Sequence, residues 1–144
     1  MGTLYQEVYD RAIFRFRDYS FLDLDAFERE TILIRYLRSA EADFERICRY
    51  DLTKRNDDEM MYEEELDNET IEVLACGMAF YWMSAHALNS ELFRNNMSTK
   101  DYTTFSPANL IREITGMRDA LYKEFNRKMV RYSYTHNDVG TRGV

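Results

Sequence analysis

Proline, glycine, histidine and cysteine are all scarce in this chain of 144 residues. There is one proline, Pro107, and there are five glycines, too few for the many tight turns of an all-β protein. Cys48 and Cys76 each fall within a helical pattern among apolar neighbours. We therefore expect two small buried thiols, because a free cysteine behaves as a small hydrophobic residue and no C-x-x-C pair is present.

The scarcity of histidine restricts the chemistry open to the chain. A di-iron helical bundle needs Glu-x-x-His on two helices, but Met83 precedes His86 by three residues and Ser133 precedes His136 by three. Glycine-rich phosphate loops and G-x-S-x-G motifs are also missing from the sequence. We therefore expect no enzyme activity, no catalytic residue, no bound metal and no cofactor.

Basic residues are missing from one acidic stretch, although the net charge of the whole chain is only −7. The charged residues within 57–69 are all acidic: Asp57, Asp58, Glu59, Glu63, Glu64, Glu65, Asp67 and Glu69. They lack the spaced ligands and the glycine of an EF-hand loop. From Pro107 onward bases outnumber acids, so the charge is polarised along the chain in a way compatible with head-to-tail self-association.

Apolar residues at three- and four-residue intervals predict an N-terminal helix over residues 3–18, where Phe14 widens the apolar surface beyond one stripe. Asp25 has the position of an N-cap for the next helix. The further helices are expected at residues 26–50, 68–88, 91–97 and 107–130.

Residues 68–88 are apolar almost all round, which predicts the centre of a bundle or a helix also covered by another subunit. Acids at the start and polar residues within this stretch favour a soluble core helix over a membrane span. Gly77 predicts a close backbone crossing, because glycine otherwise destabilises a helix interior. Ser106 and Pro107 start the last helix, at a fixed corner formed by residues 100–110.

Residues 51–66 are expected to form a solvated loop, and the alternation of Tyr132, Ser133 and Tyr134 predicts a short extended strand. The predicted fold is all-α: a helical bundle of three long helices plus an N-terminal helix and one short helix, with an extended C-terminal tail. Residues 1–130 would form the helical domain and residues 131–144 the tail.

Two stretches resemble a protein family. NETIEVLACGM at residues 68–78, followed by Trp82, is similar to a pattern in head–tail connector (adaptor or neck) proteins of long-tailed bacteriophages. KDYTTFSPAN at residues 100–109, with the ending Tyr132-Ser133-Tyr134, resembles the same family. The resemblance covers mainly residues 68–134.

This resemblance implies a structural virion protein, made in the host bacterial cytoplasm, that forms a ring at the head–tail joint. The ring, expected to be a dodecamer, would dock on the portal protein, pass viral DNA without sequence-specific binding, and carry a stopper or tail-completion protein. The predicted interface residues are Val130, Arg131, Tyr132, Ser133 and Tyr134 of the tail and Asp57, Asp58, Glu63, Glu64 and Glu65 of the acidic stretch. The alternative is a small helical regulator or inhibitor that binds one host protein.

Overall fold

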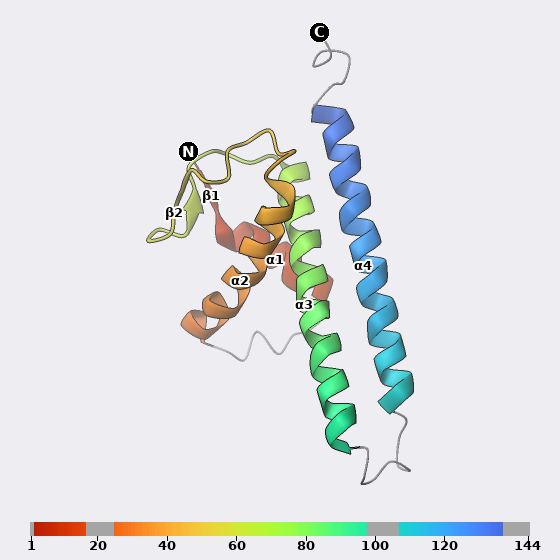
Figure 1. The fold of residues 1–144 in the computed structure, drawn as a ribbon. Coiled ribbons are helices and arrows are strands. Elements are labelled where there is room, and N and C mark those ends of the chain that lie inside the picture. The colour runs from red at the N-terminus through yellow and green to blue at the C-terminus, as the bar shows by residue number, and fades with distance from the viewer. Residues whose placement is uncertain (1, 17–24, 98–106, 137–144) are drawn as a thin grey trace.

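The computed structural model describes residues 2–16, 25–97 and 107–136. Their elements follow in the order β1 (Thr3–Leu4), α1 (Tyr5–Phe16), α2 (Ala26–Phe44), β2 (Arg55–Asn56), β3 (Met61–Tyr62), α3 (Asn68–Met97) and α4 (Pro107–His136). The long helices α3 and α4 lie side by side. α2 and the strands lie on the α3 side of this pair, and α1 crosses behind α3 (Figure 1). No helix in these described ranges has an apolar stretch long enough to cross a membrane.

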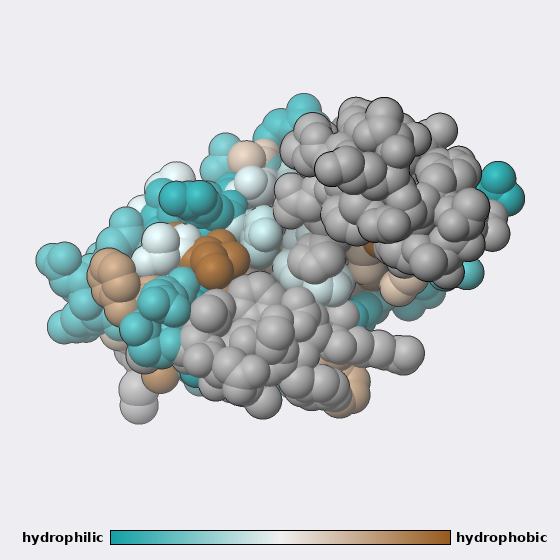
Figure 2. Space-filling model, turned by 90° about the horizontal axis from the view of Figure 1, so that it is seen from below, coloured by the Kyte–Doolittle hydropathy of each residue, from teal (hydrophilic) through white to brown (hydrophobic). Residues whose placement is uncertain are grey.

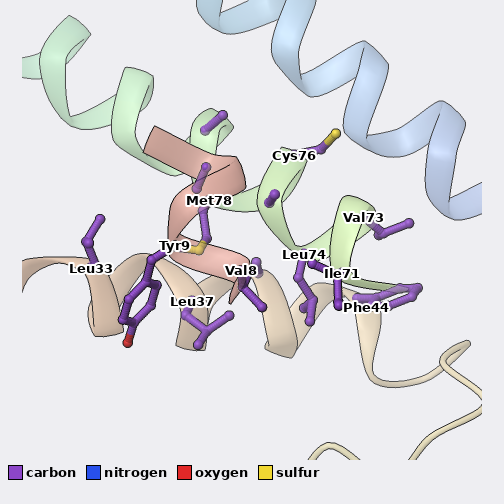
Figure 3. Packing of buried hydrophobic residues seen from close by; sticks show 14 of the residues in the cluster. Val8, Tyr9, Leu33, Leu37, Phe44, Ile71, Val73, Leu74, Cys76 and Met78 are labelled. Carbon is purple, nitrogen blue, oxygen red and sulfur yellow. The ribbon is translucent and has the colours of Figure 1, made fainter. Parts of the chain in front are cut away.

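The helix α3 is the central element, because it packs against α1, α2 and α4. Its first half is buried on all sides, as the all-round apolar sequence predicts. The buried residues of this half are Thr70, Ile71, Val73, Leu74, Ala75, Cys76, Met78, Ala79, Trp82 and Met83. Figure 3 shows Val8 and Tyr9 of α1, Leu33 and Leu37 of α2, and Leu74 and Met78 of α3 meeting in one cluster.

Gly77 lies where α3 comes close to both α2 and α4. A Cβ atom at this position would come within 2.7 Å of the Ala40 Cβ atom of α2 and 2.8 Å of the Phe125 Cζ atom of α4. Both distances are shorter than normal carbon–carbon contacts. The predicted close crossing is confirmed, and it involves two helices rather than one.

Helix starts agree with the capping residues in the sequence. The Asp25 side chain accepts a hydrogen bond from the Glu28 backbone N–H at 2.8 Å, and α2 begins at Ala26. Asp67 does the same for the Thr70 N–H at 2.8 Å, and α3 begins one residue after it. The last helix begins at Pro107 as predicted, whereas residues 100–106 of the predicted corner lie outside the described residues.

The prediction of a purely all-α fold is wrong, because residues 51–66 contain part of a small antiparallel sheet. Its strand order is β1-β3-β2, with Thr3 opposite Tyr62 and Arg55 opposite Tyr62 on the other side. Strands of two residues are too short to show an alternating pattern. The strand β1 also lies at the N-terminus, far in sequence from β3, with which it pairs. No local sequence signal therefore identifies the pairing.

Two further boundaries differ from the prediction. α3 continues without a break to Met97, so there is no separate helix over residues 91–97. Asn and Ser at positions 89 and 90 each lower helix stability by less than about 1 kcal/mol relative to alanine, which is too little to end a helix. α2 ends earlier than expected, at Phe44 instead of Tyr50, and the chain turns there toward β2.

The predicted extended strand at residues 132–134 is also wrong. α4 continues to His136, and Tyr132 is fully buried. Tyr132 lies seven residues after the buried Phe125, and a separation of two turns places both side chains on one helix face. The helical domain therefore includes residues 131–136, and residues 137–144 of the predicted tail lie outside the described residues.

Candidate functional site

A groove of about 800 Å³ lies between α1 and the α3–α4 pair. Its apolar lining comes from Phe14 of α1, Met83 of α3, and Met117, Ala120 and Leu121 of α4. Its charged lining comes from Asp10, Arg11, Arg15 and Glu72. We call this surface the α1–α4 groove.

Amphipathic patterning brings the charged side chains to one rim of the groove. Arg15 Nη1 lies 2.5 Å from Glu124 Oε1, and the other guanidinium nitrogen of Arg15 pairs with Glu72. Arg11 Nη1 lies 3.2 Å from Glu72 Oε2, and Arg11 Nη2 donates to Asn68 Oδ1 at 2.8 Å. The rim thus ties α1 to both long helices.

The ionisation of this rim is set by these contacts. Partial burial disfavours the charged form of Glu72, but the hydrogen bonds and charges of Arg15, Lys128 and Arg11 outweigh it and hold the pKa of Glu72 below its usual value. Burial raises the pKa of the nearby Cys76 thiol to about 12. Cys76 is therefore a thiol rather than a thiolate at neutral pH, and it is a poor nucleophile.

The groove places exposed apolar side chains beside paired charges. Both guanidinium groups pair with carboxylates. Phe14 is 75% exposed and Met117 is 54% exposed. In the ranges that the structure covers, no three His, Cys, Asp or Glu side chains are grouped to hold a metal ion. The groove thus offers exposed apolar surface that another apolar side chain could cover.

The predicted tail residues divide between the core and the surface. The Tyr132 hydroxyl lies 3.0 Å from Thr70 Oγ1 and accepts a hydrogen bond from the Arg49 N–H at 3.3 Å. Its ring stacks edge-on against Phe44, with 4.8 Å between centroids. Tyr132 therefore belongs to the core.

The other predicted residues of α4 are more accessible. Val130, Arg131 and Tyr134 are exposed, and Ser133 is half-buried. Contact of these four residues with a partner stays a prediction.

Two of the predicted acidic residues hold the small sheet in place. Asp57 Oδ1 accepts a hydrogen bond from the Tyr5 hydroxyl at 2.6 Å and pairs with Arg38. Glu64 Oε2 accepts from the Asp51 N–H at 3.1 Å. By contrast, Asp58, Glu63 and Glu65 are exposed.

The structure does not bring the two predicted interface groups together. The β2–β3 hairpin lies on the far side of the molecule from α4 (Figure 1). Viewed from below, the described part of the surface is mainly hydrophilic, with hydrophobic residues in separate small groups (Figure 2).

Sequence reasoning placed no functional residue in the α1–α4 groove. One signal for it existed, since Phe14 lies beside the apolar stripe of α1 rather than on it. Met117 follows the apolar spacing of α4 and is indistinguishable in sequence from a core residue. The groove depends on how α1 crosses the long helices, which is a property of tertiary packing.

Comparison with protein-family models, with curated proteins and with solved structures finds no match to this chain.

Proposed function

We propose that this chain is a structural virion protein of a long-tailed bacteriophage. It assembles as a ring at the head–tail joint, docks on the portal protein and continues the DNA channel toward stopper or tail-completion proteins. The assignment to a phage rests on the resemblance carried by residues 68–78, Trp82 and residues 100–109. The assignment to assembly rather than catalysis rests on the α1–α4 groove.

The proposal rests on the combination of paired charged side chains and exposed apolar side chains in this groove. Arg11 and Arg15 of its lining both pair with Glu72, whereas Phe14 and Met117 expose apolar surface that water solvates poorly. Anchor residues of protein interfaces are typically aromatic or methionine side chains in such a setting. A partner side chain or helix inserted here would complete the apolar packing of α1 and α4.

The experiment compares two exposed phenylalanines in binding to the portal protein of the same phage. Phe14 is 75% exposed and lines the groove; Phe27 is 80% exposed, lies on α2 and does not line it. Both Phe14→Glu and Phe27→Glu should fold, since each side chain is mostly in water. We expect Phe14→Glu to weaken binding at least tenfold and Phe27→Glu to leave it unchanged.

Absence of any complex between the wild-type chain and the portal protein would contradict the proposed function. Equal effects of the two substitutions would contradict the role of the groove.

The second candidate function is a small helical regulator that binds one host protein. The groove favours it in one respect, because a concave surface of about 800 Å³ lined by three helices can accept a single amphipathic helix. A regulator would be a stable monomer or dimer that is absent from purified virions. A connector would be retained in them.

A further inference from the structure

Two oppositely charged surfaces lie on opposite sides of this molecule. Lys123, Arg127 and Arg131 follow one another at four-residue steps along α4, so they form one ridge, which we call the basic ridge. Asp58, Glu59 and Glu63 lie at and beside the turn that joins β2 to β3, which we call the acidic tip. All six side chains are exposed.

Neither surface carries an ion pair to another described residue. No salt bridge between described residues involves any of these six side chains. The only acid within the ridge segment, Glu124, faces α1 and pairs with Arg15. Val130 and Tyr134 lie on the same exposed side of α4, and they are 47% and 71% exposed. The ridge thus combines unpaired positive charge with apolar contact surface.

The acidic tip is held in a fixed position. Asn56 Oδ1 accepts hydrogen bonds from the backbone N–H groups of Asp58 and Glu59 at 2.9 and 3.1 Å. The Met60 carbonyl accepts from the Tyr5 N–H at 2.9 Å, which ties the turn to the start of α1. The carboxylates of the tip are not used in these contacts. They project from an ordered turn, which reduces the entropy lost when a partner binds.

The positions of the two surfaces prevent them from meeting within one chain (Figure 1). Two different, complementary patches on opposite sides of a subunit are the requirement for a heterologous contact, which generates a closed ring or an open filament. A two-fold dimer uses the same face of both subunits, so it could not pair two surfaces that lie on opposite sides of the molecule.

We propose that the basic ridge of α4 is the docking site for the acidic tip of a second copy of this chain. The charge complementarity of the two surfaces selects this occupant, and the apolar side chains of Val130 and Tyr134 supply contact area beside the charges. The inference deepens the proposed ring by naming its subunit contact, and in that respect it rests on the proposed function.

The test uses two charge-reversal variants of the full chain. One carries Lys123→Glu, Arg127→Glu and Arg131→Glu; the other carries Asp58→Lys, Glu59→Lys and Glu63→Lys. Since all six side chains are exposed and unpaired, both variants should fold, which circular dichroism and thermal unfolding check. Self-association is measured by sedimentation velocity at low and high salt.

The wild-type chain is expected to self-associate at low salt and to dissociate as salt screens the contact. Each variant alone should be monomeric, because its two surfaces then carry the same sign. An equimolar mixture of the two variants should associate again, with alternating subunits, because each surface regains an opposite partner. Loss of folding cannot produce this rescue.

Several results would overturn the inference. These are a wild-type chain that stays monomeric at low salt up to millimolar concentration, self-association that neither variant changes, and variants that do not rescue one another. Binding of duplex DNA by the wild-type chain, lost in the ridge variant without any self-association, would assign the ridge to nucleic acid instead. If one of these results is obtained while the wild-type chain still binds the portal protein, the proposed function stands and the inference alone fails.

Discussion

Gly77 shows how a single residue determines the spacing of the helices. The positions of the Ala40 Cβ atom and the Phe125 ring leave no room for a side chain at this point of α3. Gly116 of α4 is the natural comparison, because nothing lies within 4 Å of the position that its Cβ would take. The two glycines are both helical and differ in their surroundings.

Alanine at these two positions should have opposite effects on stability. Gly77→Ala gains about 1 kcal/mol of helix propensity but overpacks the crossing, and we expect a net destabilisation of roughly 1–2 kcal/mol. Gly116→Ala gains propensity without a clash and should stabilise the protein by about 0.5–1 kcal/mol. Urea unfolding of both variants measures the difference. A Gly77→Ala protein as stable as the wild type would show that α2 and α4 are not held at this separation.

Tyrosine–carboxylate pairs connect α1 and α2 to the rest of the domain. The Tyr5 hydroxyl donates to Asp57, the Tyr9 hydroxyl donates to Glu30 Oε1 at 2.6 Å, and Tyr81 of α3 bonds Asp43 of α2. Burial, reinforced by the neighbouring carboxylate, raises the pKa of Tyr5 and of Tyr81 to about 12. The folded protein thus holds these protons more tightly than the unfolded chain does.

These raised pKa values predict an alkaline limit to stability. An unfolded tyrosine has a pKa of about 10, so the contribution of Tyr5 and Tyr81 is complete below that pH. It is lost as the pH rises toward their folded pKa of about 12. The urea concentration at the unfolding midpoint should decrease as the pH rises from about 10 to about 12. Tyr5→Phe should make this decrease smaller, because it removes one of the two groups. Urea unfolding followed at successive pH values tests this. An unchanged midpoint between pH 10 and 12 would contradict the pairing.

The end of α4 is the element whose role changes most once the structure is known. Tyr132 is buried against Phe44 and bonded to Thr70, whereas Tyr134, two residues later, is 71% exposed. The last turns of the helix therefore contribute to the core on one face only. Removing the chain after Met129 would delete this anchor as well as the exposed face.

Matched substitutions of the two tyrosines separate these roles. Tyr132→Ala should destabilise the protein by about 3–5 kcal/mol, because it empties an aromatic site in the core. Tyr134→Ala should change stability by no more than about 0.5 kcal/mol. Thermal unfolding of the two variants checks this, with truncation after Met129 expected to behave like Tyr132→Ala. Equal and small effects of both substitutions would show that Tyr132 does not anchor the end of α4 in the core.

At the scale of elements, the sequence predicts those features that depend on interactions between residues close together in the chain. Each helix start with a capping aspartate was located correctly, and so was the central position of α3, since both depend on neighbouring residues. The two-residue strands, the end of α2 at Phe44 and the α1–α4 groove depend on contacts between distant segments. Tyr62, for example, pairs with Thr3 from the other end of the first half of the chain. No local pattern around Tyr62 contains that information.

At the scale of the whole molecule, the net charge of −7 conceals two surfaces of opposite sign and one apolar groove. The groove lies between α1 and the long helices, the acidic tip lies at the β2–β3 turn, and the basic ridge lies along α4. The proposed ring would use these three separate surfaces for contacts with different neighbours.

Native mass spectrometry of the chain mixed with the portal protein of the same phage tests whether the chain forms the proposed ring on the portal. We expect a complex in which many copies of this chain are bound to one portal ring, with the copy number of a closed ring. Detection of the chain only as a monomer, with no complex at any ratio of the two proteins, would contradict it.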